Sequence, residues 1–120
     1  MKKTMTFEEI LENDGHLAFT NKGISMRPLL FEGRDIMLIE KKTERPKKLD
    51  AVLFKRNGIN EKETYDMHRI LRVNNDGTYW IIGDNCISGE TVKEEQVIGV
   101  LSGIIRKGKT ISVTEHLYRL

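Results

Sequence analysis

Residues 97–106 read VIGVLSGIIR, a long apolar stretch that two glycines interrupt. The many Val and Ile residues predict a β-strand, because β-branched side chains are enriched in strands. A glycine inside a strand often marks a bulge or a sharp bend. We therefore expect one long strand that bends at Gly99 and Gly103.

Shorter strands are predicted along most of the chain, since apolar stretches alternate with turn-forming residues. The turn Asn75-Asp76-Gly77 is typical of a β-hairpin, and Lys107-Gly108-Lys109 resembles a second one. The further strands that we expect cover residues 17–21, 35–40, 51–56, 64–73, 78–82 and 110–114.

One short helix is expected, over residues 6–14. Thr6 and Glu9 have the spacing of a capping box, and Asn13-Asp14-Gly15 ends the helical pattern. Beyond it we expect short turns near residues 91–95 and at the C-terminus. Many short strands, few helices and bent strands together predict a mainly β fold, as a curled sheet or a partly open barrel. The 120 residues suit a single domain, 1–120, with a β core at about 15–114.

Composition argues against several function classes. Charged residues make up 32% of the chain, but they are interspersed and the net charge is only +2, so we expect no nucleic-acid partner. The single cysteine, Cys86, cannot form an intramolecular disulfide and fits a reducing compartment. One cysteine and three scattered histidines lack zinc-ligand spacing, and no glycine-rich phosphate loop is present. We therefore expect no metal and no cofactor.

Neither a signal peptide nor an apolar run long enough to cross a membrane is recognisable. The sequence thus predicts a cytoplasmic protein without an integral membrane segment. It leaves open a peripheral membrane contact or an anchoring partner, and it does not determine the oligomeric state.

Ser25 is a candidate nucleophile within Gly23-Ile24-Ser25-Met26-Arg27-Pro28. Gly23 and Pro28 favour a turn that exposes the serine, and the N–H groups of such a turn can face a developing oxyanion. A serine is a weak nucleophile unless a base takes its proton. For an isolated serine, an ordinary loop residue is the alternative interpretation.

His68 is the candidate base. Strand alternation places Asp66, His68 and Ile70 on one face, with Met67, Arg69 and Leu71 on the other. A neutral imidazole can act as general base near pH 7. A half-buried sheet histidine without catalytic role is the alternative. The other two histidines, His16 and His116, are expected at the surface.

Gly83-Asp84-Asn85 follows an apolar strand, and Glu90 is a second acid on the same loop. Asp84 could orient His68 or pin the loop to the protein. Asp and Asn in a glycine-containing turn can also serve simply as turn formers.

In this order, these segments resemble the catalytic domain of the signal peptidase and LexA-like serine peptidase group. The resemblance covers roughly residues 15–106. The matching segments are Gly23-x-Ser25-Met26-x-Pro28-Leu29, Gly33-Arg34-Asp35, Leu49-Asp50-Ala51-Val52-Leu53-Phe54, His68-Arg69-Ile70, Gly83-Asp84-Asn85 and Val97-Ile98-Gly99.

The resemblance implies a LexA/signal peptidase-like coiled, partly open β-barrel that acts as a serine endopeptidase. Ser25 matches the nucleophile. His68 stands where many bacterial members have a lysine, as in archaeal and endoplasmic-reticulum signal peptidases. Asp84 matches the first acid of that branch, and Glu90 stands in the region where a further Asp is expected.

Gly23, Met26 and Pro28 are the expected substrate-binding residues, and the expected substrate is a peptide or precursor protein, such as one with a leader. Some signal peptidases carry a hydroxyl two residues before the nucleophile, where this chain has Gly23. The family's membrane anchor, DNA-binding domain and additional late domain are not recognisable. A stand-alone catalytic core is therefore expected.

The sequence leaves two other functions open. A non-catalytic module on the same fold could bind an extended peptide along an exposed strand edge. A small nucleic-acid-binding barrel could use Tyr65, Tyr79 and Trp80 for base stacking, although core packing is the alternative role for Tyr79 and Trp80.

The apolar residues after Ser25 could line a substrate groove, touch a membrane surface or pack in the core. At least two of the four are expected in the core. They are Met26, Leu29, Leu30 and Phe31.

Overall fold

The computed structural model describes residues 6–20, 26–27, 29–31, 33–57 and 63–112. This part of the chain is mainly β. Its helices are too short or too polar to span a lipid bilayer. The described elements are α1 Phe7–Asp14, β1 His16–Thr20, β2 Asp35–Lys41, β3 Ala51–Asn57, β4 Glu63–Val73, β5 Tyr79–Ile82, β6 Glu90–Val92, the 3-10 helix η2 Glu94–Gln96, β7 Val97–Arg106 and β8 Lys109–Ser112.

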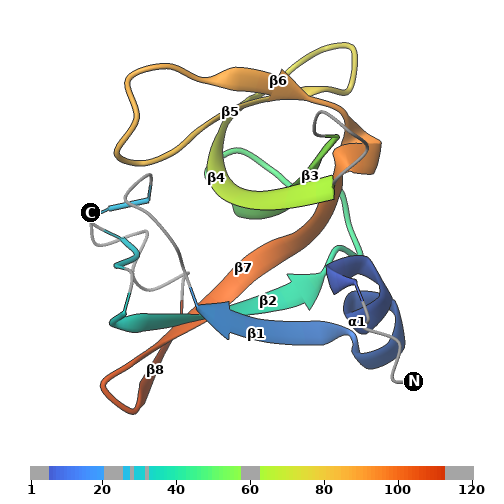
Figure 1. The fold of residues 1–120 in the computed structure, drawn as a ribbon. Coiled ribbons are helices and arrows are strands. Elements are labelled where there is room, and N and C mark those ends of the chain that lie inside the picture. The colour runs from blue at the N-terminus through green and yellow to red at the C-terminus, as the bar shows by residue number, and fades with distance from the viewer. Residues whose placement is uncertain (1–5, 21–25, 28, 32, 58–62, 113–120) are drawn as a thin grey trace.

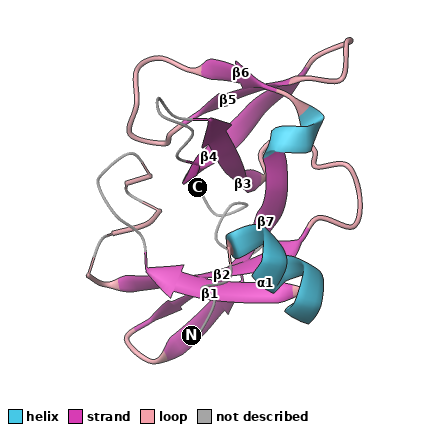
Figure 2. Ribbon diagram, turned by 45° about the vertical axis from the view of Figure 1, so that its right-hand side comes forward, coloured by secondary structure: helices cyan, strands magenta, loops and turns pink. Residues whose placement is uncertain are grey.

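The described strands form one antiparallel sheet in the order β1-β2-β7-β3-β4-β5-β6, and β8 pairs with β7. Figure 1 shows β3 to β6 on one side of the molecule and β1, β2 and β8 on the other, with β7 running through both. The same arrangement is visible after rotation in Figure 2, where α1 lies against β1. The described strands thus form a sheet that curls but stays open.

Strand β7 belongs to both sides of the sheet because one of its edges pairs with β3 at one end and with β8 at the other. Residues 97–100 of β7 pair with β3, and residues 103–106 pair with β8. The other edge pairs with β2 along residues 99–106.

The predicted irregularities in β7 are confirmed next to its glycines. Register shifts leave Ile98 unmatched against β3 and Ser102 unmatched against β2. A Cβ on Gly99 would lie 2.6 Å from Ile39 Cγ2, and one on Gly103 would lie 3.1 Å from the carbonyl oxygen of Ile111. A side chain at Gly99 would therefore force Ile39 to shift, and one at Gly103 would sit tightly against the backbone of β8.

The predicted helix and both hairpins are confirmed. The amide of Glu9 donates to Thr6 Oγ1 at 3.1 Å, which completes the capping box, and Gly15 ends α1 in the left-handed conformation. The turn before β5 is closed by a hydrogen bond from the Asn74 amide to the carbonyl of Thr78. Strands β7 and β8 are joined through the turn at Lys107 and Gly108.

Most strand ends differ from the expectation by one residue, and some further details differ as well. The expected turn at 91–95 overlaps β6 and η2, because the three-residue β6 finds pairing partners on β5. Strand β8 begins at Lys109, one residue earlier than expected. A register shift between Ile70 and Arg72 leaves Leu71 unmatched and exposed, so it does not share the buried face of Met67 and Arg69. The expected turn at the C-terminus lies outside the described residues.

The buried apolar residues of the described chain form two clusters. Alternation along β3 sends Ala51 and Leu53 into the first and Val52 and Phe54 into the second, so both faces of this strand are buried. The first cluster contains Leu11, Leu17, Met26, Leu29, Leu30, Met37, Ile39, Ala51, Leu53, Met67, Leu101 and Ile104. The second contains Val52, Phe54, Ile70, Tyr79, Ile81, Val92 and Val97.

The core prediction for the segment after Ser25 is confirmed. Met26, Leu29 and Leu30 are fully buried, and Phe31 is half-buried. Tyr79 is also fully buried, as its core-packing interpretation predicts.

Candidate functional site

His68 lies half-buried on β4, opposite Val52 of β3. Its ring packs against that of Phe54, with centroids 5.5 Å apart. Burial lowers the pKa of His68 below its ordinary value of about 6.5; Asp66 acts in the opposite direction, and Arg56 adds to the lowering. The imidazole is therefore neutral near pH 7, which is the form that can accept a proton.

Asp84 is held by Arg69, the residue after His68. Arg69 Nε and Nη2 each donate to one carboxylate oxygen at 2.6 Å, and Nη1 donates to the carbonyl of Leu49 at 3.0 Å. Both partners of this ion pair are largely buried. Asp84 thus fastens the loop after β5 to strand β4.

Glu90 is held by a second arginine. Arg56 Nη1 and Nη2 donate to the two carboxylate oxygens of Glu90 at 2.7 Å, and Arg56 Nε donates to Asp66 at 2.6 Å. The guanidinium also lies 4.8 Å from the centroid of the Phe54 ring. Among the described residues, neither Asp84 nor Glu90 hydrogen-bonds to His68.

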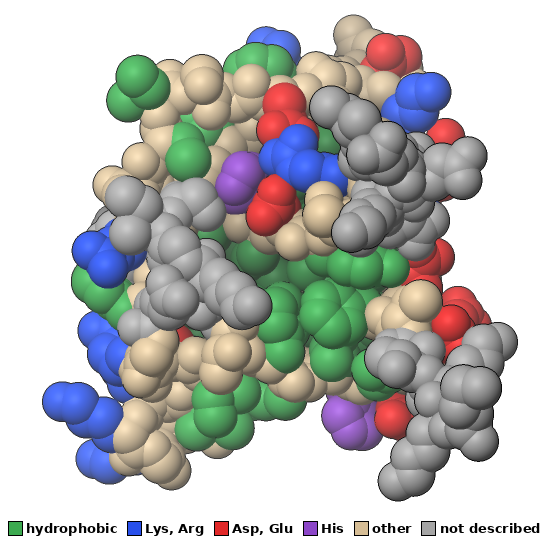
Figure 3. Space-filling view, viewed as in Figure 1, with side chains coloured by type: hydrophobic (Ala, Val, Ile, Leu, Met, Phe, Trp, Pro, Cys, Tyr) green, Lys and Arg blue, Asp and Glu red, His purple; other side chains and the backbone are tan. Residues whose placement is uncertain are grey.

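The surface of this region has a distinct charge pattern. Figure 3 shows a histidine next to a basic side chain with acidic side chains on two sides, above a band of hydrophobic side chains.

Phe7 packs against Phe19 and Tyr65 with centroid distances of 4.8 and 4.9 Å, and all three are only partly buried. These aromatic residues bring apolar surface from α1, β1 and β4 together.

Gly23, Ser25 and Pro28 lie outside the described residues. The structure therefore does not describe the distance between Ser25 and His68. Met26, which follows Ser25 in the chain, is fully buried. The amide of Asp84 lies 3.3 Å from Met26 Sδ, to which it donates. The Met26 side chain therefore packs against the Asp84 loop.

Asp35 anchors the other end of this segment. Its carboxylate is fully buried and accepts hydrogen bonds from Arg106 Nε at 2.8 Å, from Arg34 and from the amide of Phe31. Burial alone would raise the pKa of Asp35, but the hydrogen bonds from Arg106, Arg34 and Phe31 bring the pKa well below its usual range. Since Arg106 Nη2 also donates to the carbonyl of Leu29, the buried carboxylate ties residues 29–31 to β7.

The remaining histidines are separate from this region. His16 is exposed on β1, as expected, and His116 lies outside the described residues. Within the described ranges, no group of three or more His, Cys, Asp or Glu side chains is arranged to hold a metal ion.

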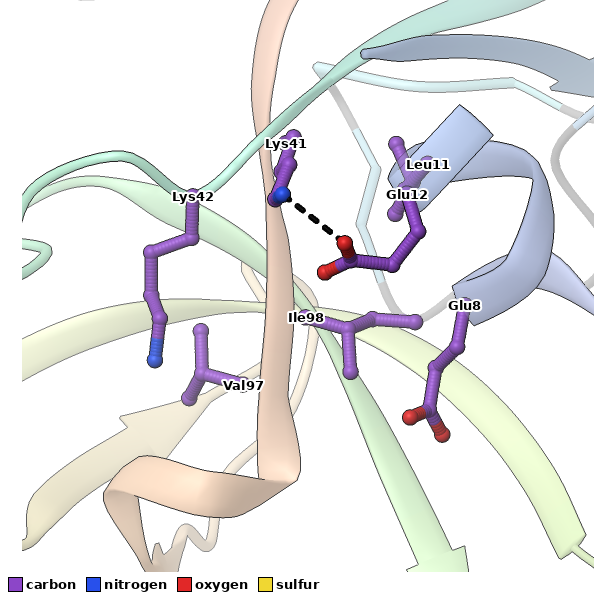
Figure 4. A pocket seen from close by; sticks show the side chains of 7 residues that line it. All are labelled: Glu8, Leu11, Glu12, Lys41, Lys42, Val97 and Ile98. Carbon is purple, nitrogen blue, oxygen red and sulfur yellow. Dashed lines mark hydrogen bonds and ion pairs between the residues drawn. The ribbon is translucent and has the colours of Figure 1, made fainter. Parts of the chain in front are cut away.

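A pocket of about 170 Å³ lies beside α1, β2 and β7 (Figure 4). Its charged side chains are already paired: Lys41 Nζ lies 3.0 Å from Glu12 Oε2, and Lys42 binds Glu94. Glu8, a further lining residue, pairs with Lys55. This pocket involves none of the residues around His68.

Sequence reasoning did not assign roles to Arg56, Asp66 or Asp35. Asp66 could have been identified as a neighbour of His68, since strand alternation already placed the two residues on the same face. The contact of Arg56 with Asp66 could be identified only from the register of the β3–β4 pair, in which Phe54 faces Asp66. The contact of Arg56 with Glu90 depends on the path of a loop and had no sequence signal.

Comparison with protein-family models, curated proteins and solved structures found no match. Function is therefore inferred from the motifs and geometry of this chain alone.

Proposed function

We propose that this protein is a serine endopeptidase of the signal peptidase-like kind, with Ser25 as nucleophile and His68 as general base. One series of contacts carries the proposal. Met26, the neighbour of Ser25, packs against the Asp84 loop, and Arg69, the neighbour of His68, holds the same loop. The loop thus connects the two segments that bear the proposed catalytic residues.

The chemistry is acyl transfer. Ser25 Oγ attacks a peptide carbonyl while His68 takes its proton, and the amide of Ser25 helps to stabilise the oxyanion. The proton then passes to the leaving amine, which departs as the peptide bond breaks. Water hydrolyses the acyl-enzyme and restores the serine. The low pKa of His68 supports this role, because the base must be neutral to act.

The fold proposed for this enzyme is the coiled, partly open β-barrel of the LexA and signal peptidase group. An open, bent antiparallel sheet with one N-terminal helix agrees with it. We further propose a peptide or precursor protein as substrate. The partly exposed aromatic cluster of Phe7, Phe19 and Tyr65 would supply apolar contacts for its side chains.

The second candidate is a peptide-binding module without catalysis. It is favoured by the engagement of both proposed acids with arginines: Asp84 with Arg69, and Glu90 with Arg56. In that function the same surface would hold an extended peptide but leave it intact.

A fluorophosphonate probe separates these candidates, because it reacts with an activated serine. We expect the wild-type protein to be labelled, Ser25→Ala to be unlabelled and His68→Ala to be labelled at least about 100-fold more slowly. His16→Ala is the matched control, since His16 is exposed on β1, and it should be labelled like wild type.

Equal labelling of wild type and Ser25→Ala would exclude Ser25 as the nucleophile. Absence of labelling in every protein, together with retained peptide binding, would favour the binding module.

A further inference from the structure

Arg56 is placed to control the charge around His68. Its guanidinium uses three nitrogens on two carboxylates, Glu90 and Asp66, at 2.6 to 2.7 Å. Asp66 precedes His68 by two residues on β4, so the two side chains project from the same face. Glu90 reaches the same place from β6.

Phe54 provides the platform for this arrangement. The ring is fully buried, with the Arg56 guanidinium 4.8 Å and the His68 ring 5.5 Å from its centroid. Since the Phe54 ring lies against both groups, a fully buried core residue sets the position of the guanidinium relative to the imidazole.

The charged groups that face His68 come from each element packed around it. Asp66 lies on β4, Arg56 on β3 and Glu90 on β6, and Asp84 follows β5. The three carboxylates favour the imidazolium form, and Arg56 opposes it. A carboxylate that is already hydrogen-bonded to Arg56 also has fewer lone pairs left for an imidazole N–H.

We propose that Arg56 is a positioning residue for the general base: by binding Asp66 and Glu90, it prevents either carboxylate from pairing with His68 and keeps the imidazole available to accept a proton. This inference rests on the proposed function of His68. It extends that function by adding a residue that acts on the base without touching the substrate.

The test is an NMR titration of the His68 imidazole between about pH 5 and about pH 8, which needs no substrate. The His68 signal is assigned by its loss in His68→Gln. In Arg56→Met we expect the His68 pKa to rise, because both carboxylates are released. Arg56→Lys retains the charge but loses the three-nitrogen contact with the two carboxylates, so its His68 pKa should lie between those of wild type and Arg56→Met.

Arg72→Met is the matched control. Arg72 is also an arginine of this sheet, but it is exposed and hydrogen-bonds to Asn74 in the β4–β5 turn. Its removal should leave the His68 titration unchanged. An unchanged His68 pKa in folded Arg56→Met would overturn the proposal.

Glu90→Gln gives an independent result if Arg56→Met does not fold. It removes one of the two carboxylates bound to Arg56, and with it a negative charge that favours the imidazolium form. The His68 pKa should therefore fall. A rise would contradict the proposal.

A second readout links the arrangement to catalysis. In Arg56→Met, the ratio of the labelling rate at about pH 6 to that at about pH 8 should fall below the wild-type ratio, because more of the base is protonated at the lower pH. If neither wild type nor any variant reacts with the probe, the proposed function fails, while the titration still decides whether Arg56 keeps the His68 imidazole neutral.

Discussion

At the scale of single residues, His68 is in an environment that penalises its charged form. It is half-buried, packs on an aromatic ring and faces a guanidinium that is shared by two acids. The protein therefore resists protonation of this side chain. The preference for the neutral imidazole suits a general base. It also makes the stability of the folded state depend on pH in the acidic range.

The sign of this effect follows from linkage. The folded-state pKa of His68 lies below the value of about 6.5 expected in the unfolded chain. Between these two values the unfolded state binds the additional proton, so the free energy of unfolding falls as the pH drops below about 6.5. Below the folded-state pKa this contribution is lost and no further change arises from His68.

We predict that His68→Gln weakens the pH dependence of stability in this window. Urea unfolding of wild type and variant at several values between about pH 5 and about pH 7.5 measures it. Parallel stability curves for wild type and His68→Gln would contradict the assigned environment.

At the scale of elements, the segment after Ser25 is held at two points. Met26 packs against the Asp84 loop, and Asp35 ties residues 29–31 to β7 through Arg106. A buried carboxylate that binds two arginines and a backbone amide is costly to replace, because its partners would be left without a counter-charge.

We predict that Asp35→Asn destabilises the protein by about 3 kcal/mol, measured by urea unfolding. Glu40→Gln, also on β2 but exposed, is the control and should change stability by less than about 0.5 kcal/mol. Equal stability of Asp35→Asn and wild type would show that the buried carboxylate does not anchor this segment.

The elements themselves were largely predictable, for local reasons. Strands, hairpin turns and the capped helix depend on residues close together in the sequence. The irregularities of β7 were signalled by Gly99 and Gly103. Strand β6 was missed because three residues with one apolar side chain carry little signal, and its pairing comes from β5.

The partners of the charged residues could not be predicted in the same way. Arg56 and Glu90 are 34 residues apart, and Arg69 and Asp84 are 15 apart. Such choices depend on the register of distant strands and on loop paths. The candidate base and acids could therefore be identified from sequence motifs. The arginines that bind those acids could be identified only from the structure.

At the scale of the whole molecule, the two buried clusters lie on opposite faces of β3, and β7 joins both halves of the sheet. The contacts of the Asp84 loop join the segment after Ser25 to β4 within this frame. The proposed endopeptidase therefore depends on parts of the chain that only the complete sheet brings together.

The most direct test is cleavage of a peptide library, followed by mass spectrometry. We predict that the wild-type protein cuts a defined subset of peptides, that Ser25→Ala and His68→Ala abolish these cuts, and that His16→Ala cuts the same subset. Products that appear equally with wild type and Ser25→Ala, or a wild-type protein that binds peptides but leaves them all intact, would contradict the proposed function.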